Sequence, residues 1–248
     1  MANMKELISA FGRHRKNSKT ENAFEIQRFF FDNNSDMTIF DVGAYVGDVT
    51  RIYLDNFPGA AIYCFEPFDE SFRQLEKLSE KKLIRTYRTA VSDHTGRTKL
   101  HVNKDLTCNS FFPRPESGPA YYPQDAQNVG GVEVDTTTID NFCESENIER
   151  IDILKMDVEG AEKKVLSGAC NKLSKHNIYL IYTEIIFVPH YEGGCMFHEL
   201  TAFLEQYGYT LFNFYNLKSA KNGQLRWGNA IYLSPQARAK ADQICLKK

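Results

Sequence analysis

The chain has 248 residues, of which 42% are hydrophobic and 25% charged, with a net charge of −2 at pH 7. This predicts one large globular α/β domain and argues against a general basic surface for nucleic acid. No apolar run is long enough for a membrane span, and the N-terminus lacks a signal peptide's apolar core, so we expect a cytoplasmic protein. The six cysteines form no C-x-x-C pair, and we expect free thiols rather than a zinc site.

Hydrophobic periodicity divides the chain into an N-terminal helical extension, 1–36, and a main domain, 37–248. In chain order, the pattern predicts a helix at 21–33, a strand at 38–42, a helix at about 48–56, a strand at 61–65, a helix at 69–79 and strands at 84–91 and 98–102. The last two strands are expected to form a hairpin through the turn at 93–96. Residues 103–131 carry half of the prolines and little periodicity, which indicates a long irregular loop of the kind that is usually functional or disordered.

The second half of the chain repeats the alternation of strands and helices. It predicts helices at 136–148, 159–168, 196–207 and 235–246 and strands at 151–156, 178–187, 209–215 and 225–233. Alternation of this kind is typical of a mostly parallel, doubly wound α/β sheet, and the closing hairpin would add an antiparallel edge. In such sheets ligands bind beyond the carboxyl ends of the strands.

The first strand runs into the glycine turn D-V-G-A-Y-V-G, which begins at Asp41. Glycine directly after a strand lets the backbone turn tightly and lets a ligand approach. Glu66 ends the second strand, at the spacing where a carboxylate accepts the hydroxyls of a ribose. An alternative is that Glu66 is simply a surface acid before Pro67.

The turn favours one class of cofactor over another. A dinucleotide fingerprint would read G-x-G-x-x-G, whereas here Gly47 follows Gly43 by four residues and Asp41 lies within the turn. An acid suits a ligand with cationic groups, such as the sulfonium and ammonium of S-adenosylmethionine. Hydride transfer is therefore the weaker interpretation.

At this point the sequence resembles a known family. The segments IFDVGAYVGDVT, CFEP, TTTIDNF and ILKMDVEGAEKKVLSGA are similar to the FkbM family of S-adenosylmethionine-dependent methyltransferases, over about 38–233. The resemblance implies the class I methyltransferase fold, with a seven-stranded, Rossmann-like sheet. It also implies O-methylation of a hydroxyl on a sugar, a glycan or glycolipid, or a polyketide-like small molecule.

The resemblance also assigns cofactor-binding residues. It places Asp41, Gly43, Ala44 and Gly47 at the methionine-side turn, Glu66 and Pro67 at the ribose, and Ser92 and Asp93 at the adenine. Asn109 and Ser110 lie in the variable loop that would close over the cofactor. Tyr45 stands where the family commonly has Asn, so backbone donors would have to hold the methionine carboxylate.

Acids at two further strand ends are candidates for the chemistry. Asp157 and Glu159 follow the strand at 151–156, and Glu184 lies in the strand at 178–187. They could supply a base for the acceptor hydroxyl, or a site for a divalent metal ion that acidifies it. They could equally cap the following helix or, for Glu184, pair with an arginine. His190, in the next loop, is a further candidate base and Asp157 a further cofactor contact.

Three functions remain open. The leading hypothesis is an O-methyltransferase that acts on a small-molecule or glycan hydroxyl, with the irregular loop at 103–131 shaping the acceptor site. It would have no nucleic acid partner and no membrane span, and it could form a homo-oligomer. A methyltransferase acting on nucleic acid would usually carry an Asn/Asp-Pro-Pro-aromatic turn, which DVEG replaces at 157–160. A non-catalytic domain that binds S-adenosylmethionine is the third, because fold alone carries no function.

Overall fold

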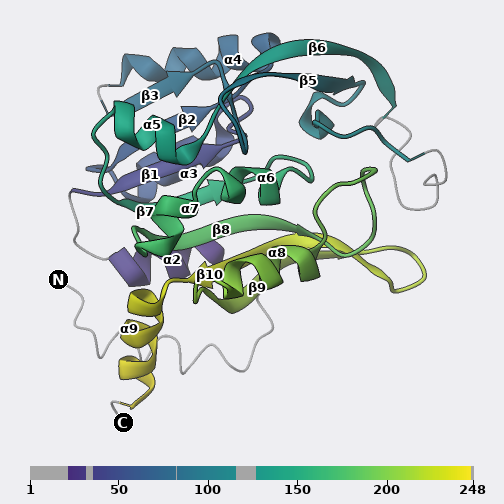
Figure 1. The fold of residues 1–248 in the computed structure, drawn as a ribbon. Coiled ribbons are helices and arrows are strands. Elements are labelled where there is room, and N and C mark those ends of the chain that lie inside the picture. Colours follow the sequence, from purple (N-terminus) through teal and green to yellow (C-terminus); the bar gives the residue numbers. More distant parts are fainter. Residues whose placement is uncertain (1–21, 32–35, 82, 116–126, 247–248) are drawn as a thin grey trace.

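The computed structural model describes residues 22–31, 36–81, 83–115 and 127–246. A seven-stranded sheet in the order β3-β2-β1-β7-β8-β10-β9 runs through its centre (Figure 1). The strands are β1 (Thr38–Val42), β2 (Ala61–Phe65), β3 (Ile84–Tyr87), β7 (Ile151–Met156), β8 (Ile178–Ile186), β9 (Thr210–Ser219) and β10 (Leu225–Leu233). The first five are parallel to one another, and β10 pairs antiparallel with both β8 and β9. The predicted fold class, a mostly parallel sheet with an antiparallel C-terminal hairpin, is confirmed.

Helices cover both faces of this sheet. They are α2 (Ala23–Phe31), α3 (Asp48–Asn56), α4 (Asp69–Leu75), α5 (Ile139–Ser145), α6 (Glu162–Ser167), α7 (Cys170–Ser174), α8 (Phe197–Glu205) and α9 (Pro235–Leu246), with 3₁₀ turns η2 (Glu76–Glu80) and η3 (Leu106–Cys108). Side chains of α5, α6, α7 and α8 share one hydrophobic cluster with the sheet, and those of α2, α3, α4 and α9 share the other. Because both faces are covered, β7 is buried along its whole length, which explains its apolar run.

The helix predicted for the N-terminal extension is α2, and it packs into the core of the main sheet. Phe24 makes edge-to-face contacts with Tyr53 of α3 and Tyr182 of β8, and Phe31 makes one with Tyr179. Aromatic pairs of this geometry contribute about 0.5–1.5 kcal/mol beyond the area they bury. This helix therefore shares the hydrophobic core of the main domain; the rest of the predicted extension, 1–21 and 32–35, lies outside the described residues.

The strand predicted at 84–91 is in fact two strands that belong to different sheets. β3 pairs with β2, whereas β4 (Ala90–Val91) joins a three-stranded sheet in the order β4-β6-β5. The predicted hairpin is also wrong, because β5 (Gly96–Asn103) pairs over most of its length with β6 (Asn128–Thr137). The turn at 93–96 therefore connects β4 to β5 within the three-stranded sheet, where β6 lies between these two strands. In Figure 1, β5 and β6 extend together beyond the main sheet.

Two other predicted boundaries change. The irregular segment 103–131 ends earlier than expected, since Asn128 already begins β6, and its residues 116–126 lie outside the described part of the chain. The helix expected at 159–168 begins only at Glu162, whose Oε1 accepts the Val158 N–H at 3.2 Å. Residues 157–161 are consequently a turn rather than the first turn of a helix.

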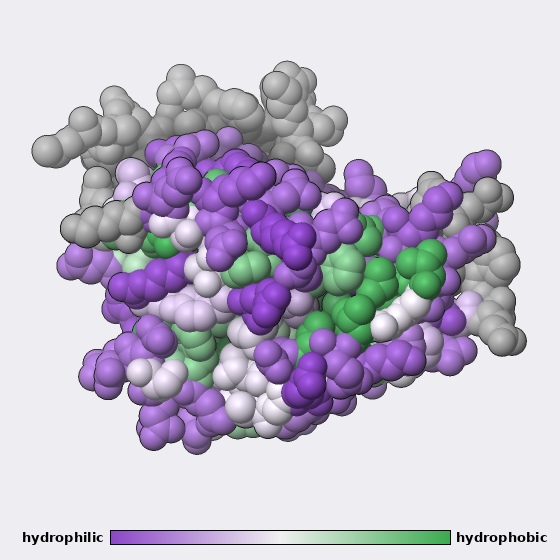
Figure 2. Space-filling view, turned by 90° about the horizontal axis from the view of Figure 1, so that it is seen from above, coloured by the Kyte–Doolittle hydropathy of each residue, from purple (hydrophilic) through white to green (hydrophobic). Residues whose placement is uncertain are grey.

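Within the described residues, no helix is long and apolar enough to cross a bilayer. The five cysteines with described side chains are unpaired, as expected. Figure 2 looks down on the molecule from the top of Figure 1 and shows a largely hydrophilic face with an apolar patch on the right, the side to which β5 and β6 extend. The exposed Val129 and Val132 belong to β6.

Candidate active site

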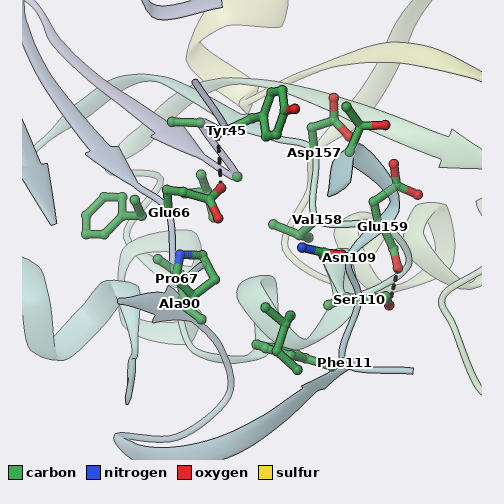
Figure 3. A pocket seen from close by; sticks show the side chains of 18 of the residues that line it. Tyr45, Glu66, Pro67, Ala90, Asn109, Ser110, Phe111, Asp157, Val158 and Glu159 are labelled. Atoms are coloured by element: carbon green, nitrogen blue, oxygen red, sulfur yellow. Dashed lines mark hydrogen bonds between the residues drawn. The ribbon is translucent and has the colours of Figure 1, made fainter. Parts of the chain in front are cut away.

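A cavity opens where β1, β2 and β7 end at the same edge of the sheet (Figure 3). Its walls are residues 42–45 after β1, 65–67 after β2, 157–159 after β7 and 109–111 from the loop beyond η3. Apolar side chains line one side of it: Val91, Leu100, Phe111 and Val158. Since the carboxyl ends of adjacent parallel strands meet at one edge, three segments far apart in the sequence are brought together.

Glu66 projects into the centre of this cavity from the end of β2. Its Oε2 accepts the Tyr45 N–H at 3.0 Å, and its Oε1 accepts the Phe68 N–H at 2.9 Å. Burial raises the pKa of Glu66 to about 7, against the lowering effect of these two bonds. The carboxylate is thus held in one orientation, with its remaining lone pairs available to a ligand.

The glycine turn brings β1 against the end of β7. Gly43 has φ +71°, and a Cβ at this position would lie 1.9 Å from the Asp157 carbonyl oxygen. Gly43 and Ala44 both donate their N–H groups to the Phe65 carbonyl at 3.0 Å. Glycine is therefore required at position 43 because the ends of β1 and β7 come into direct contact there. The sequence had suggested a different reason, the close approach of a ligand. Tyr45 follows with φ +51°.

Asp41 does not line the cavity. Its side chain is fully buried below the turn, where Oδ1 forms an ion pair with Lys155 Nζ at 2.9 Å and Oδ2 accepts the Thr50 hydroxyl at 2.6 Å. Lys155 Nζ also donates to the Gly43 carbonyl at 2.7 Å, so the pair braces the turn. Lys155, which lines the cavity, was not identified as a site residue from the sequence. A signal existed, because a lysine in an apolar strand needs a partner, and Asp41 faces it in the β1–β7 register.

Several other predicted residues also lie off the cavity wall. Gly47 begins α3 with φ +87°, against Leu75 and Leu78. Ser92 is buried and donates to Asp93, whose carboxylate binds Lys164 at 2.8 Å. By contrast Ala44, Tyr45, Glu66, Pro67, Asn109, Ser110, Asp157 and Glu159 all line it.

Two loops close over the turn at 157–161. Ser110 donates its hydroxyl to the Glu159 carbonyl at 2.6 Å, as Figure 3 shows. From the loop after β8, Tyr191 donates its hydroxyl to Glu159 Oε2 at 2.5 Å and is also 3.2 Å from the Cys108 carbonyl. The Arg114 guanidinium stacks 4.2 Å from the Tyr191 ring centre. The loops at 106–114 and 188–195 thereby hold Glu159 and each other in place.

His190 lies in the second loop but not on the cavity wall. It is 8% exposed, and its carbonyl accepts from Arg114 Nη1 at 3.2 Å. Burial, together with Arg114 and Arg226, lowers the pKa of His190 to about 4. The ring is neutral at physiological pH, and any catalytic role for it remains a prediction.

Asp157, Glu159 and Glu184 converge beside the cavity, and the first two line it across from Glu66 whereas Glu184 does not line it (Figure 3). One carboxylate oxygen from each lies within 4.8 Å of the other two. None of these three side chains caps α6. The side chain that accepts a hydrogen bond from the turn before this helix, from the Val158 N–H, is that of Glu162. Burial and the neighbouring Asp157 raise the pKa of Glu159 to about 8, and burial with Glu159 and Asp157 raises that of Glu184 well above its usual range.

The sequence matches the model of the methyltransferase FkbM domain over residues 41–211. The chain belongs to the FkbM methyltransferase family. It is therefore an S-adenosylmethionine-dependent methyltransferase with the class I fold, and the resemblance seen in the sequence is confirmed.

Curated relatives of this FkbM-family enzyme methylate different molecules. It is 31% identical to the 2-O-methyltransferase NoeI of Sinorhizobium fredii over 64% of this chain and 67% of that one. It is 26% identical to the 31-O-demethyl-FK506 methyltransferase FkbM of Streptomyces tacrolimicus (52% and 58%) and 26% identical to the hexuronic acid methyltransferase AglP of Haloferax volcanii (59% and 55%). These matches span little more than half to two thirds of the relatives' lengths.

Solved methyltransferase structures are more distant. The TrmK structure of M. capricolum with S-adenosyl-homocysteine matches 86% of this chain and 69% of its own, at 10% identity and a TM-score of 0.46. The fibrillarin of Aeropyrum pernix with bound S-adenosyl-L-methionine matches 92% and 74%, at 11% identity and a TM-score of 0.45. Likeness at this level says nothing about the methyl acceptor.

Proposed function

We propose that this enzyme transfers a methyl group from S-adenosylmethionine to a hydroxyl of a sugar, a glycan or glycolipid, or a polyketide-like small molecule. The observation that carries the proposal is the arrangement of the cavity, which the fixed Glu66 carboxylate enters from one side and the Asp157 and Glu159 carboxylates line on the other. The printed activities of the relatives support the acceptor classes, since they include a 2-O-methyltransferase and a hexuronic acid methyltransferase.

The residues of the cavity fit the methyl donor. Glu66 has lone pairs free for two ribose hydroxyls, and the apolar wall of Val91, Leu100 and Phe111 suits an adenine ring. The turn at 43–45 would lie along the methionine part, with Asp157 beside the cationic groups. Asp41 would act indirectly, by holding Lys155 and the turn in position.

When bound, the cofactor supplies an electrophilic methyl group on a sulfonium. Its transfer to the acceptor oxygen would break the carbon–sulfur bond and leave a thioether, and this chain or the solvent would have to receive the hydroxyl proton. As long as no cation is bound to them, Glu159 and Asp157 are the described residues best placed to take that proton, because both line the cavity. Tyr191 holds the Glu159 carboxylate by its hydroxyl. Fixing donor and acceptor in line contributes about 7–11 kcal/mol toward such a displacement.

Mass spectrometry of a panel of nucleotide sugars, glycolipids and polyketides incubated with the enzyme and cofactor tests this function. A gain of one methylene unit in mass on a hydroxylated acceptor is the expected result, and it should be absent in the double variant Asp157→Asn, Glu159→Gln. Tight cofactor binding without turnover on any acceptor would favour the non-catalytic alternative. Methylation of RNA or DNA in place of these acceptors would contradict the proposal.

A further inference from the structure

The three clustered carboxylates of Asp157, Glu159 and Glu184 come from neighbouring parts of the sheet. Asp157 directly follows β7, and Glu184 directly follows the residue of β8 that pairs with the last residue of β7. Glu159 reaches the same point because the backbone at this residue has φ +53° and turns the side chain back. Like charges at this separation repel, so the cluster must bind a cation or hold protons.

The side chain of Glu184 gives a second observation. Its Oε2 atom is buried and has no hydrogen-bond partner in the described structure, although the residue as a whole is half-buried. Buried polar atoms without a protein partner are uncommon in folded proteins, and a bound ligand, water or ion commonly explains them. This oxygen belongs to a carboxyl group that is part of the cluster of three.

Two cationic side chains act on the cluster through their charge, Arg114 on Glu159 and Lys155 on Asp157, but both are also engaged elsewhere. Lys155 is occupied by Asp41 and by the Gly43 carbonyl. Arg114 stacks on the Tyr191 ring and donates to the His190 carbonyl. In the part of the chain that the structure describes, no ion pair joins any lysine or arginine to Asp157, Glu159 or Glu184.

We propose that Asp157, Glu159 and Glu184 bind a divalent cation with a preference for oxygen ligands, Mg²⁺ or Mn²⁺, and that the acceptor hydroxyl joins its coordination shell. Three carboxylate oxygens and open positions for water or substrate are the ligand set that such hard ions take. Oxygens bound to Mg²⁺ at about 2.1 Å lie roughly 3–4 Å apart, so small side-chain rotations within the 4.8 Å cluster suffice.

The role of the ion rests on the proposed O-methyl transfer, whereas its binding does not. A coordinated hydroxyl loses its proton more readily than a free one, and the resulting oxygen is the better nucleophile. Because Asp157 and Glu159 are then ligands of the ion, the proton passes to solvent and not to either of them, and the ion itself is neither oxidised nor reduced. Coordination also fixes the acceptor oxygen beside the cofactor cavity, to which Asp157 and Glu159 both belong.

Binding is tested without cofactor or acceptor. Protein treated with EDTA and exchanged into metal-free buffer is titrated with MnCl₂, and free Mn²⁺ is followed by electron paramagnetic resonance. The expected result is one Mn²⁺ per chain, with an affinity at least tenfold lower in Glu184→Gln and in Asp157→Asn. Both amides keep the size of the side chain and remove repulsion, so thermal melting should show folded variants.

The matched control is Glu192→Gln, which removes one negative charge from an exposed side chain in the adjacent loop. It should bind Mn²⁺ as the unchanged protein does. The proposal is overturned if the unchanged protein binds no Mn²⁺, or if Glu184→Gln and Glu192→Gln bind it equally. If methyl transfer persists in EDTA and the protein binds no Mn²⁺, the cation site is refuted and the proposed function stands. If the protein binds Mn²⁺ but methylates no acceptor, the cation site stands and the proposed function is refuted.

Discussion

Replacing Glu66 by glutamine separates cofactor binding from stability. If Glu66 accepts the ribose hydroxyls, the substitution removes a charged acceptor, and hydrogen bonds to charged groups contribute about 1.5–3 kcal/mol. The dissociation constant for S-adenosylmethionine should rise roughly 10- to 150-fold at pH 8, measured by isothermal titration calorimetry. The control is Glu70→Gln, which removes an exposed acid nearby and should leave the affinity unchanged.

The pH dependence follows from the pKa of about 7 for Glu66 in the free protein. Below this pH the carboxyl group is protonated and must lose its proton to accept from both hydroxyls. Binding to the unchanged protein should therefore weaken by up to about tenfold at pH 6. The Glu66→Gln variant has no such group and should show little change.

The free energy of unfolding of the cofactor-free protein should depend on pH in the opposite direction to cofactor binding. The folded protein holds the Glu66 proton more tightly than the unfolded chain, so its free energy of unfolding falls as pH rises from 4.5 to about 7. The rise in the pKa of Glu66 from 4.5 to about 7 corresponds to a loss of about 3 kcal/mol in the free energy of unfolding above pH 7. Glutamine avoids this loss, but its amide N–H group would face a backbone N–H, which costs about 1–3 kcal/mol. Cofactor-free Glu66→Gln should melt at pH 8 at least as high as the unchanged protein. Unchanged cofactor affinity at pH 8 would refute the reasoning.

Two further predictions concern the charges around the site. Lys155→Met leaves the buried Asp41 carboxylate without its partner and should lower the free energy of unfolding by about 3–5 kcal/mol in urea titrations, whereas Lys164→Met, at an exposed pair, should cost less than about 1 kcal/mol. In metal-free protein the pKa of Glu159, raised to about 8, makes the folded state retain a proton that the unfolded chain releases, so stability should fall as pH rises from about 5 to 8. Glu159→Gln, whose carbonyl can still accept from Tyr191, should flatten this slope in urea unfolding at several pH values; an unchanged slope would count against the assignment.

Local periodicity was sufficient to predict the main sheet, because its strands are short apolar runs followed at once by helices. It failed for β5 and β6, whose pairing joins segments separated by the irregular loop. Nothing in the run at 84–91 shows that the chain leaves one sheet at Tyr87 and enters another at Ala90. Such decisions depend on partners distant in the sequence, which a local pattern cannot contain.

The candidate site could also be predicted only in part, because some of its residues depend on partners distant in the sequence. Carboxylates at strand ends gather at one edge of a parallel sheet, so the convergence of Asp157, Glu159 and Glu184 follows from the order of elements. Asp41 was placed at the ligand because it is acidic and precedes a glycine, but its direction depends on the neighbouring Lys155. The roles of Arg114 and Tyr191 arise only when two loops meet, and each of these residues taken alone looks like ordinary surface or core.

The contact between those two loops has a consequence for engineering this enzyme. Tyr191 bonds to Glu159 and lies in hydrogen-bonding reach of the Cys108 carbonyl, and the Glu192 N–H bonds to the Pro113 carbonyl at 2.9 Å. Segments 106–114 and 188–195 thus behave as one module. A chimaera that takes only one of these segments from a relative would lose the hydrogen bonds between them. Exchanges intended to alter the choice of acceptor should therefore replace both segments together.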